Sequence, residues 1–170
     1  MIIDLGQMEE ASRRFELNVG ADELDLDNPT FRLTGDARAS GEIRKGSAQI
    51  DVSGSISAPA EIDCARCLEP IARELTFDFA ASFVAPENFS TDKEREVSAE
   101  DLDVDILESD QIDLKQVIRE QIVLNFPEQV FCGPDCKGLC PKCGANRNLI
   151  DCNCDLDETD PRWAALKNLR

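Results

Sequence analysis

Apolar and polar residues alternate along two runs of the chain, residues 48–62 and residues 71–83. A period of two places successive side chains on opposite faces of a strand, so each run predicts a half-buried β-strand. Residues 63–68 between the runs predict a tight connection, and the two runs together predict a long antiparallel hairpin. A shorter alternating run at residues 31–37 predicts a further strand. Pro59 cannot donate to a strand ladder and therefore predicts an edge strand or a bulge.

Three segments predict helices. Gln7–Arg14 predicts a short helix near the start of the chain. Asp113 is a typical N-cap residue, with Gln116 as its capping-box partner, and the helical spacing of apolar residues that follows stops before Pro127. The apolar stripe of this amphipathic helix is expected to cover one face of the sheet. Asp160-Pro161 predicts a short C-terminal helix, with aspartate at the cap and proline in the first turn.

The remaining segments predict a turn and a loop. Ser40-Gly41 predicts a polar turn. The acidic residues 86–110 predict a mobile loop that includes a short strand around Val104–Leu107. The chain as a whole therefore predicts an α+β fold: a long antiparallel hairpin or sheet, a covering helix and a cysteine-rich, zinc-ribbon-like C-terminal module.

The composition excludes several classes of protein. The chain has 170 residues, enough for one domain or for one domain with a small module. It contains no histidine, which excludes Ser-His-Asp and Cys-His catalysis and a histidine-bound catalytic zinc. Because it shows neither a secretory signal nor a long uninterrupted apolar run, we expect a cytoplasmic protein.

Charge is distributed unevenly along the chain. There are 35 acidic and 18 basic residues, a net charge of −17, yet residues 131–170 hold six of each. The same forty residues hold six of the eight cysteines. We therefore predict a boundary near Phe131, between an acidic α+β body at 1–130, which includes the hairpin-tip cysteine pair, and a metal module at 131–170. The excess of acid argues against a body that grips phosphate backbones.

The cysteines have the spacing of metal ligands. Two residues between thiols let the backbone wrap an ion and direct amide groups at the sulfurs, and four thiolates make a closed zinc site. A reducing cytosol favours metal binding over disulfides. We predict one or two zinc ions and two groups of ligands: Cys64, Cys67, Cys132 and Cys136 in one, and Cys140, Cys143, Cys152 and Cys154 in the other.

Several alternatives remain open for these thiols. They could form disulfides, or Cys64 and Cys67 could be a redox pair, although such pairs normally start a helix and this one is predicted at a hairpin tip. Iron suits tetrahedral sulfur ligation as well as zinc does, and would indicate an iron-thiolate redox or electron-transfer protein. Closed thiolate sites leave no position for a catalytic water, so we expect a protein that is not an enzyme.

Basic residues gather around the predicted metal module. Two interpretations remain open: a face that contacts RNA or another partner, and a solvated surface balanced by acids. The candidate partner-binding residues are Arg66, Lys137, Lys142, Arg147 and Arg162.

The motifs Cys64-Ala-Arg-Cys67-Leu68 and Cys136-Lys-Gly-Leu-Cys140-Pro-Lys-Cys143-Gly144, followed by Asn148 and Asp160-Pro161-Arg162, resemble those of the YceD family of large ribosomal RNA subunit accumulation proteins. The resemblance extends from about Phe31 to the end of the chain. It implies a non-enzymatic cytoplasmic factor needed for accumulation of large-subunit (23S) ribosomal RNA. From the uneven distribution of charge we further expect that the acidic body binds a basic ribosomal protein, while the neutral module contacts ribosomal RNA. No membrane and no small-molecule substrate are expected.

Overall fold

The computed structural model of the chain describes residues 1–8, 10–26, 28–86, 104–107, 109–127, 129–154 and 162. The chain divides into two compact units. The first consists of Met1–Ile62 and Ala72–Glu128, and the second consists of Asp63–Ile71 and Gln129–Arg170. The predicted division kept the hairpin-tip cysteines in the body, whereas the structure groups the tip with the C-terminal segment, because the tip thiols lie beside those of that segment.

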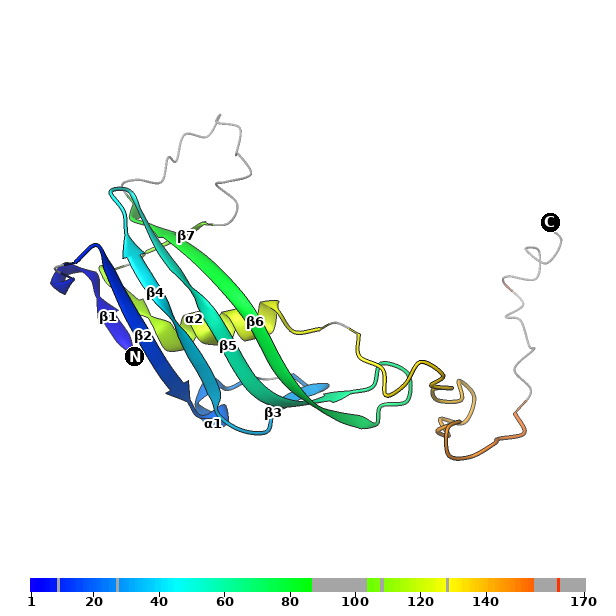
Figure 1. The fold of residues 1–170 in the computed structure, drawn as a ribbon. Coiled ribbons are helices and arrows are strands. Elements are labelled where there is room, and N and C mark those ends of the chain that lie inside the picture. Colours follow the sequence, from blue (N-terminus) through cyan, green and yellow to red (C-terminus); the bar gives the residue numbers. More distant parts are fainter. Residues whose placement is uncertain are drawn as a thin grey trace. The chain divides into compact units, whose positions relative to one another are not determined.

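The first unit is built on a curved, mostly antiparallel sheet, so the fold is α+β with few helices (Figure 1). Its strands follow the order β2-β4-β5-β6-β7, β3 also pairs with β5, and β7 lies parallel to β6. The bounds are β2 (Ser12–Val19), β3 (Phe31–Leu33), β4 (Ala37–Lys45), β5 (Gln49–Asp63), β6 (Pro70–Val84) and β7 (Val104–Ile106). A separate ladder joins β1 (Ile2–Asp4) to β8 (Gln111–Asp113).

The predicted long hairpin is confirmed as strands β5 and β6. Alternation along β5 has the expected consequence, since Val52 and Ile56 are buried while the residues between them are more exposed. Pro59 does not make β5 an edge strand. β4 pairs with β5 as far as Ser57 and β3 pairs with it from Ala60, so Pro59 lies where β5 changes its partner and no ladder donor is needed.

Two local predictions near the N-terminus are wrong. Instead of a helix at Gln7–Arg14, the chain forms a 3-10 turn at Leu5–Gln7 and then enters β2. The whole of β2 pairs with β4, from Ser12↔Arg44 to Val19↔Ala37, and this non-local ladder decides the conformation of a segment with little local preference. Ser40-Gly41 is not a turn either. It lies in the middle of β4, where the ladder with β2 fixes an extended conformation.

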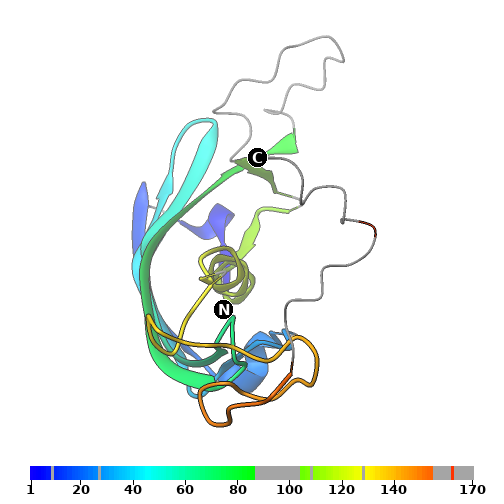
Figure 2. The ribbon, with the colours of Figure 1, turned by 90° about the vertical axis from the view of Figure 1, so that its right-hand side faces the viewer.

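The predicted amphipathic helix is α2 (Leu114–Leu124), which ends before Pro127. Asp113 caps it, because its Oδ1 accepts a hydrogen bond from the backbone N–H of Lys115 at 3.0 Å. The capping box is not formed: Gln116 donates instead to Glu120. Figure 2 shows α2 end-on, on the concave side of the curved strands. Its buried side chains are Leu114, Val117, Ile118 and Ile122.

Other segments complete the description. A short helix α1 (Ala21–Leu24) follows β2, and Arg119 of α2 donates to the carbonyl oxygens of Leu24 and Asp25. The predicted strand around Val104–Leu107 is confirmed as β7. The predicted loop at 86–110 lies largely, and the predicted helix at Asp160-Pro161 wholly, outside the described residues. Within the described ranges no helix is long and apolar enough to span a bilayer.

Candidate metal centre

Two cysteine knuckles with the same backbone form hold the first thiols in place. In the first, the N–H of Leu68 donates to the carbonyl of Cys64 at 2.9 Å. In the second, the N–H of Gly144 donates to the carbonyl of Cys140 at 2.8 Å. Leu68 and Gly144 each follow the second cysteine of a knuckle and adopt positive φ, 60° and 73°. Glycine adopts this conformation without strain at Gly144, whereas a leucine occupies the equivalent position of the other knuckle.

The eight thiols form the two predicted groups. We call Cys64, Cys67, Cys132 and Cys136 site A, and Cys140, Cys143, Cys152 and Cys154 site B. Within each site all four sulfur atoms lie within 4.8 Å of one another. The cysteines are free rather than joined in disulfides.

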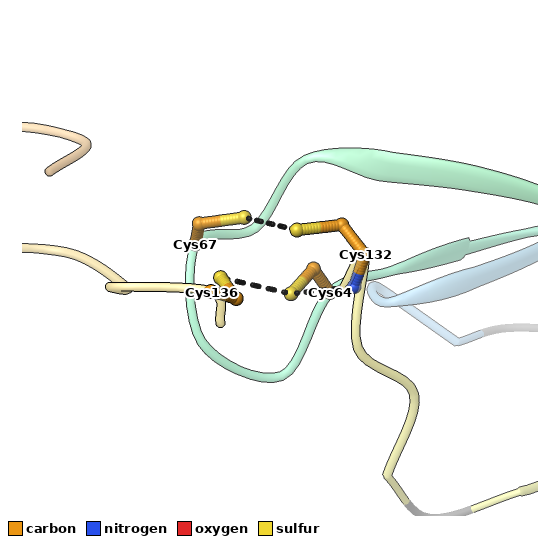
Figure 3. A group of neighbouring side chains, drawn as sticks. All are labelled: Cys64, Cys67, Cys132 and Cys136. Carbon is orange, nitrogen blue, oxygen red and sulfur yellow. Dashed lines mark hydrogen bonds between the residues drawn. The ribbon is translucent and has the colours of Figure 1, made fainter. Parts of the chain in front are cut away.

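The spacing of sulfur atoms in site A fits a tetrahedral ion (Figure 3). Four sulfurs at about 2.3 Å from zinc lie about 3.8 Å from one another at the corners of a tetrahedron. The Sγ atoms of Cys64 and Cys136 are 3.8 Å apart, and those of Cys67 and Cys132 are 3.6 Å apart. Two pairs that come from segments more than sixty residues apart thus meet with the geometry of one ion.

The first thiol of each knuckle ionises readily. Burial of the Cys64 thiol raises its pKa, but backbone N–H groups, that of Arg66 foremost, outweigh burial and bring the pKa of Cys64 to about 6. The backbone N–H groups of Cys143 and Lys142 bring the pKa of Cys140 to about 6. Because the thiolate is the form that binds metal, each knuckle presents a ligand that is ionised at neutral pH.

Other thiols of site A keep their protons. The backbone N–H of Glu69 acts to lower the pKa of Cys67, but burial and the neighbouring thiols outweigh it, and the pKa of Cys67 is raised. The side chain of Cys136, and after it that of Cys67, raises the pKa of Cys132 to about 12. One negative sulfur therefore opposes ionisation of the next.

Site B follows the same pattern. The side chain of Cys140 raises the pKa of Cys152, and the side chain of Cys143 raises the pKa of Cys154 to about 12. A divalent cation removes this opposition, because it attracts all four thiolates at once.

These pKa values predict a pH-dependent metal affinity. Two thiols of each site are protonated at neutral pH, so an incoming ion displaces at least about two protons per site, and affinity rises with pH. Below about pH 6 the dependence should steepen, because Cys64 and Cys140 are then protonated as well. Competition with a chromophoric zinc chelator across this range measures the slope, and an affinity that does not change with pH would contradict the assignment of these thiols.

The positive φ of Leu68 predicts a stabilising substitution. A left-handed conformation costs a residue with a Cβ atom about 1 kcal/mol, whereas glycine adopts it freely. Leu68→Gly should therefore raise the stability of the metal-loaded second unit by up to about 1 kcal/mol, measured by chelator-induced unfolding. Leu68→Ala is the control, since it removes the exposed side chain but keeps the strain. Equal behaviour of the two variants would show that φ is not the cause.

Among the predicted partner-binding residues, Arg66 has contacts within the second unit. Its guanidinium donates to the carbonyl oxygens of Pro134 at 3.3 Å and Cys136 at 3.1 Å. It also lies 4.5 Å from the ring centroid of Phe131. Arg66 therefore ties the hairpin tip to the segment that carries the other ligands of site A. Of the other candidates, Lys137, Lys142 and Arg162 are exposed and Arg147 is half-buried.

The first unit has a groove, lined by both apolar and polar side chains, that the sequence did not predict. The groove has a volume of about 770 Å³ and lies between α2 and residues of β1, β7 and β8. Carboxylates of Asp105, Asp113 and Glu120 line it. Val123 and Leu124 are apolar but lie outside the buried stripe of α2. Apolar residues at such positions are the sequence signal that could have located the groove. Its exposed apolar side chains are Ile2 (63% exposed), Ile106 (48%), Val123 (55%) and Leu124 (73%).

Comparison with protein families identifies a match over most of the chain. The profile described as large ribosomal RNA subunit accumulation protein YceD matches residues 52–170, which include all eight cysteines. A comparison with solved structures found no match.

Individual relatives extend the similarity. An uncharacterized protein of Mycobacterium tuberculosis (strain ATCC 25618 / H37Rv) is 36% identical over 115 residues, which are 68% of this chain and 53% of that protein, so the chain spans about half the length of this relative. The uncharacterized protein YlbN of Bacillus subtilis (strain 168) is 30% identical over 169 residues, 99% of this chain and 94% of YlbN. The large ribosomal RNA subunit accumulation protein YCED homolog 1, chloroplastic, of Arabidopsis thaliana is 40% identical over 60 residues, 35% of this chain and 19% of that protein.

Proposed function

Because the chain belongs to the YceD family of large ribosomal RNA subunit accumulation proteins, we propose that it is a non-enzymatic cytoplasmic factor that supports accumulation of large-subunit (23S) ribosomal RNA. The family match over residues 52–170 carries this proposal. The factor works by binding a component of the assembling large subunit, and zinc in sites A and B stabilises its second unit.

The metal part of the proposal rests on the donor set. Eight thiolates in two closed groups suit structural zinc, and in site A the sulfur spacing supports one ion. In this proposal the second unit is a zinc-ribbon-like module and α2 covers the concave face of the sheet. Zinc bound there supplies cross-linking and charge neutralisation, while the chain's own thiolates and backbone N–H groups orient it.

Elemental analysis of the purified protein tests the metal. We expect two zinc ions per chain and no visible absorption. Iron with a visible absorption band would instead favour an iron-thiolate redox or electron-transfer protein, since iron accepts the same ligands. Purified protein incubated with large-subunit ribosomal RNA should leave it intact, and metal-dependent cleavage would overturn the non-enzymatic assignment.

The groove beside α2 is the proposed binding site for a basic ribosomal protein. Its exposed apolar side chains offer an area that a partner could bury, and its carboxylates, in a chain of net charge −17, complement a segment rich in Lys and Arg. Among the described residues that line it, the one lysine or arginine is Arg119, which already donates to two backbone carbonyls of the first unit. The occupant that fits is therefore a basic segment with apolar side chains on one face.

Substitution at the groove gives a direct prediction. Val123→Lys with Leu124→Lys removes two exposed apolar side chains and adds positive charge, so binding to a basic ribosomal protein should fall about tenfold or more. Stability should change little, because both positions are exposed and lysine is a good helix former. Pull-down from cells with quantitative identification of ribosomal proteins measures the effect.

A matched control separates the loss of the groove surface from the general effect of two added lysines. Leu149→Lys with Ile150→Lys makes the same change at two exposed apolar residues of the second unit. This control should leave ribosomal-protein binding intact. In cells that lack the native protein, the groove variant should also fail to restore the ratio of large-subunit to small-subunit ribosomal RNA. Full rescue by the groove variant would contradict the proposed partner site.

A further inference from the structure

The loop 144–151 connects two ligands of site B, Cys143 and Cys152. Its start is held by backbone hydrogen bonds, since the N–H of Cys140 donates to Ala145 at 2.8 Å and that of Gly144 to Cys140 at 2.8 Å. The two cysteines that flank the loop bind the same ion when site B is loaded. The path of this loop therefore depends on site B.

A side chain from this loop reaches site A. The Nδ2 atom of Asn148 donates to the Sγ atom of Cys136 at 3.4 Å. The Oδ1 atom of Asn148 accepts from the backbone N–H of Lys137 at 2.8 Å, which fixes the amide with its N–H group toward the sulfur. Asn148 therefore places a hydrogen-bond donor on a thiol of site A from a loop anchored at site B.

Asn146 holds the donor in position. Its Oδ1 atom accepts from both the backbone N–H and the Nδ2 atom of Asn148 at 3.0 Å. Its own Nδ2 atom donates to Glu69 of the hairpin tip at 3.1 Å. The contact with Cys136 is thus part of a small network that joins the loop of site B to both segments that supply site A.

From these contacts we infer that Asn148 couples the two metal sites: an ion at site B fixes the loop 144–151, the loop presents the Asn148 amide to the Cys136 thiolate, and site A binds its ion more tightly. The inference deepens the proposed function and rests on its metal binding. Groups that hydrogen-bond to a metal ligand typically change metal affinity 10–100-fold, so the coupling should be of that order. By thermodynamic linkage, an ion at site A strengthens site B by the same factor.

Backbone hydrogen bonds form a second connection between the loop of site B and the segments of site A, beside the one made by the Asn148 side chain. The N–H of Leu139 donates to Arg66 at 2.9 Å and the N–H of Arg147 donates to Gly138 at 2.9 Å. Dismantling site B disturbs both routes, whereas a change at Asn148 alone removes only the amide. The experiment therefore uses both kinds of variant.

The variant Asn148→Asp isolates the amide. It keeps an oxygen for the N–H of Lys137 and all eight thiols, but replaces the donor facing Cys136 with a second oxygen. Gln129→Glu is the matched control, because it makes the same charge change at an exposed residue of the same unit that does not adjoin a ligand. Each protein is loaded with ¹¹³Cd, and chelator titration is followed by NMR, which gives a separate resonance for each site.

Asn148→Asp should weaken site A about 10–100-fold, while Gln129→Glu changes it by less than about threefold. Cys143→Ser with Cys154→Ser should weaken site A at least about tenfold, and Asn148→Asp should then add little, because the loop no longer presents the amide. Equal effects of Asn148→Asp and Gln129→Glu, or effects of Asn148→Asp that simply add to those of dismantling site B, would overturn the coupling.

The outcomes also separate this inference from the proposed function. If site A binds its ion with the same affinity in every variant, the coupling is wrong and the metal-bound factor stands. If neither site binds an ion in the unaltered protein, the metal part of the proposed function fails and the coupling fails with it. Should the double cysteine variant not fold, the comparison of Asn148→Asp with Gln129→Glu in the eight-thiol protein decides alone.

Discussion

Removing the metal with a strong chelator should unfold the second unit and leave the first unit folded. Among the described residues, the apolar centre of the second unit consists largely of its own thiols: Cys64, Cys67 and Cys136 are buried together, with Ile71 and Leu139 packed against them. So small a core gives little stability without a cross-link such as a disulfide or a structural metal. Structural zinc typically contributes about 10–16 kcal/mol to the folding of such modules, far more than that core can supply.

Hydrogen exchange followed by mass spectrometry measures this effect segment by segment. Peptides from 63–71 and 129–154 should lose protection when the metal is removed, while those from β4, β5 and α2 keep theirs. The first unit is the internal control, because its core of aliphatic residues such as Ile43, Ile56 and Ile118 contains no thiol. Unchanged protection of 129–154 after complete metal removal would show that the thiols hold the unit without an ion.

Gly54→Ala should destabilise the first unit by about 3 kcal/mol and lower its Tm by about 10 °C or more. Gly54 lies directly opposite Gly41 in the β4–β5 ladder. A Cβ atom on Gly54 would collide with the backbone carbonyl of Ser40 and lie 2.8 Å from the Cα atom of Gly41. No side-chain rotation relieves a clash with backbone, so the two central strands must separate.

The control for this prediction is Gly20→Ala in the same unit. A Cβ atom there would meet its nearest neighbour, an atom of Glu23, at 3.6 Å, which is ordinary van der Waals contact. Thermal unfolding of metal-loaded protein should show a large shift for Gly54→Ala and a small one for Gly20→Ala. If the two shifts are equal, the close approach of β4 and β5 at the glycine pair is not a constraint on the fold.

The parts of the fold that follow local patterns were predictable. Period-two alternation identified β5 and β6, and the side chain of Asp113 identified the start of α2. β2 was missed because its first three residues, Ser12–Arg14, are all polar and its conformation is decided by β4, from Ser12↔Arg44 to Val19↔Ala37. The capping box was predicted from residue types alone; in the structure the Gln116 amide instead turns along the helix and donates to Glu120.

The candidate metal centre was predictable to the level of its thiols. Cysteine spacing gave the division into sites A and B, because short spacers restrict which thiols can share an ion. Spacing carries no information about the side-chain amides of Asn146 and Asn148, whose contacts depend on the path of a loop. The role of Arg66 was equally hidden, since its hydrogen bonds go to backbone carbonyls, which every residue provides.

Site A draws its ligands from two distant parts of the chain, and this has a consequence for synthesis. Cys64 and Cys67 are translated sixty-five residues or more before Cys132, about 3–13 s earlier at about 5–20 residues per second. Site B, in contrast, has its four thiols within residues 140–154. Every new molecule therefore passes through a period in which the thiol pair of the hairpin tip lacks its partners, and site A cannot close before Cys136 has been translated.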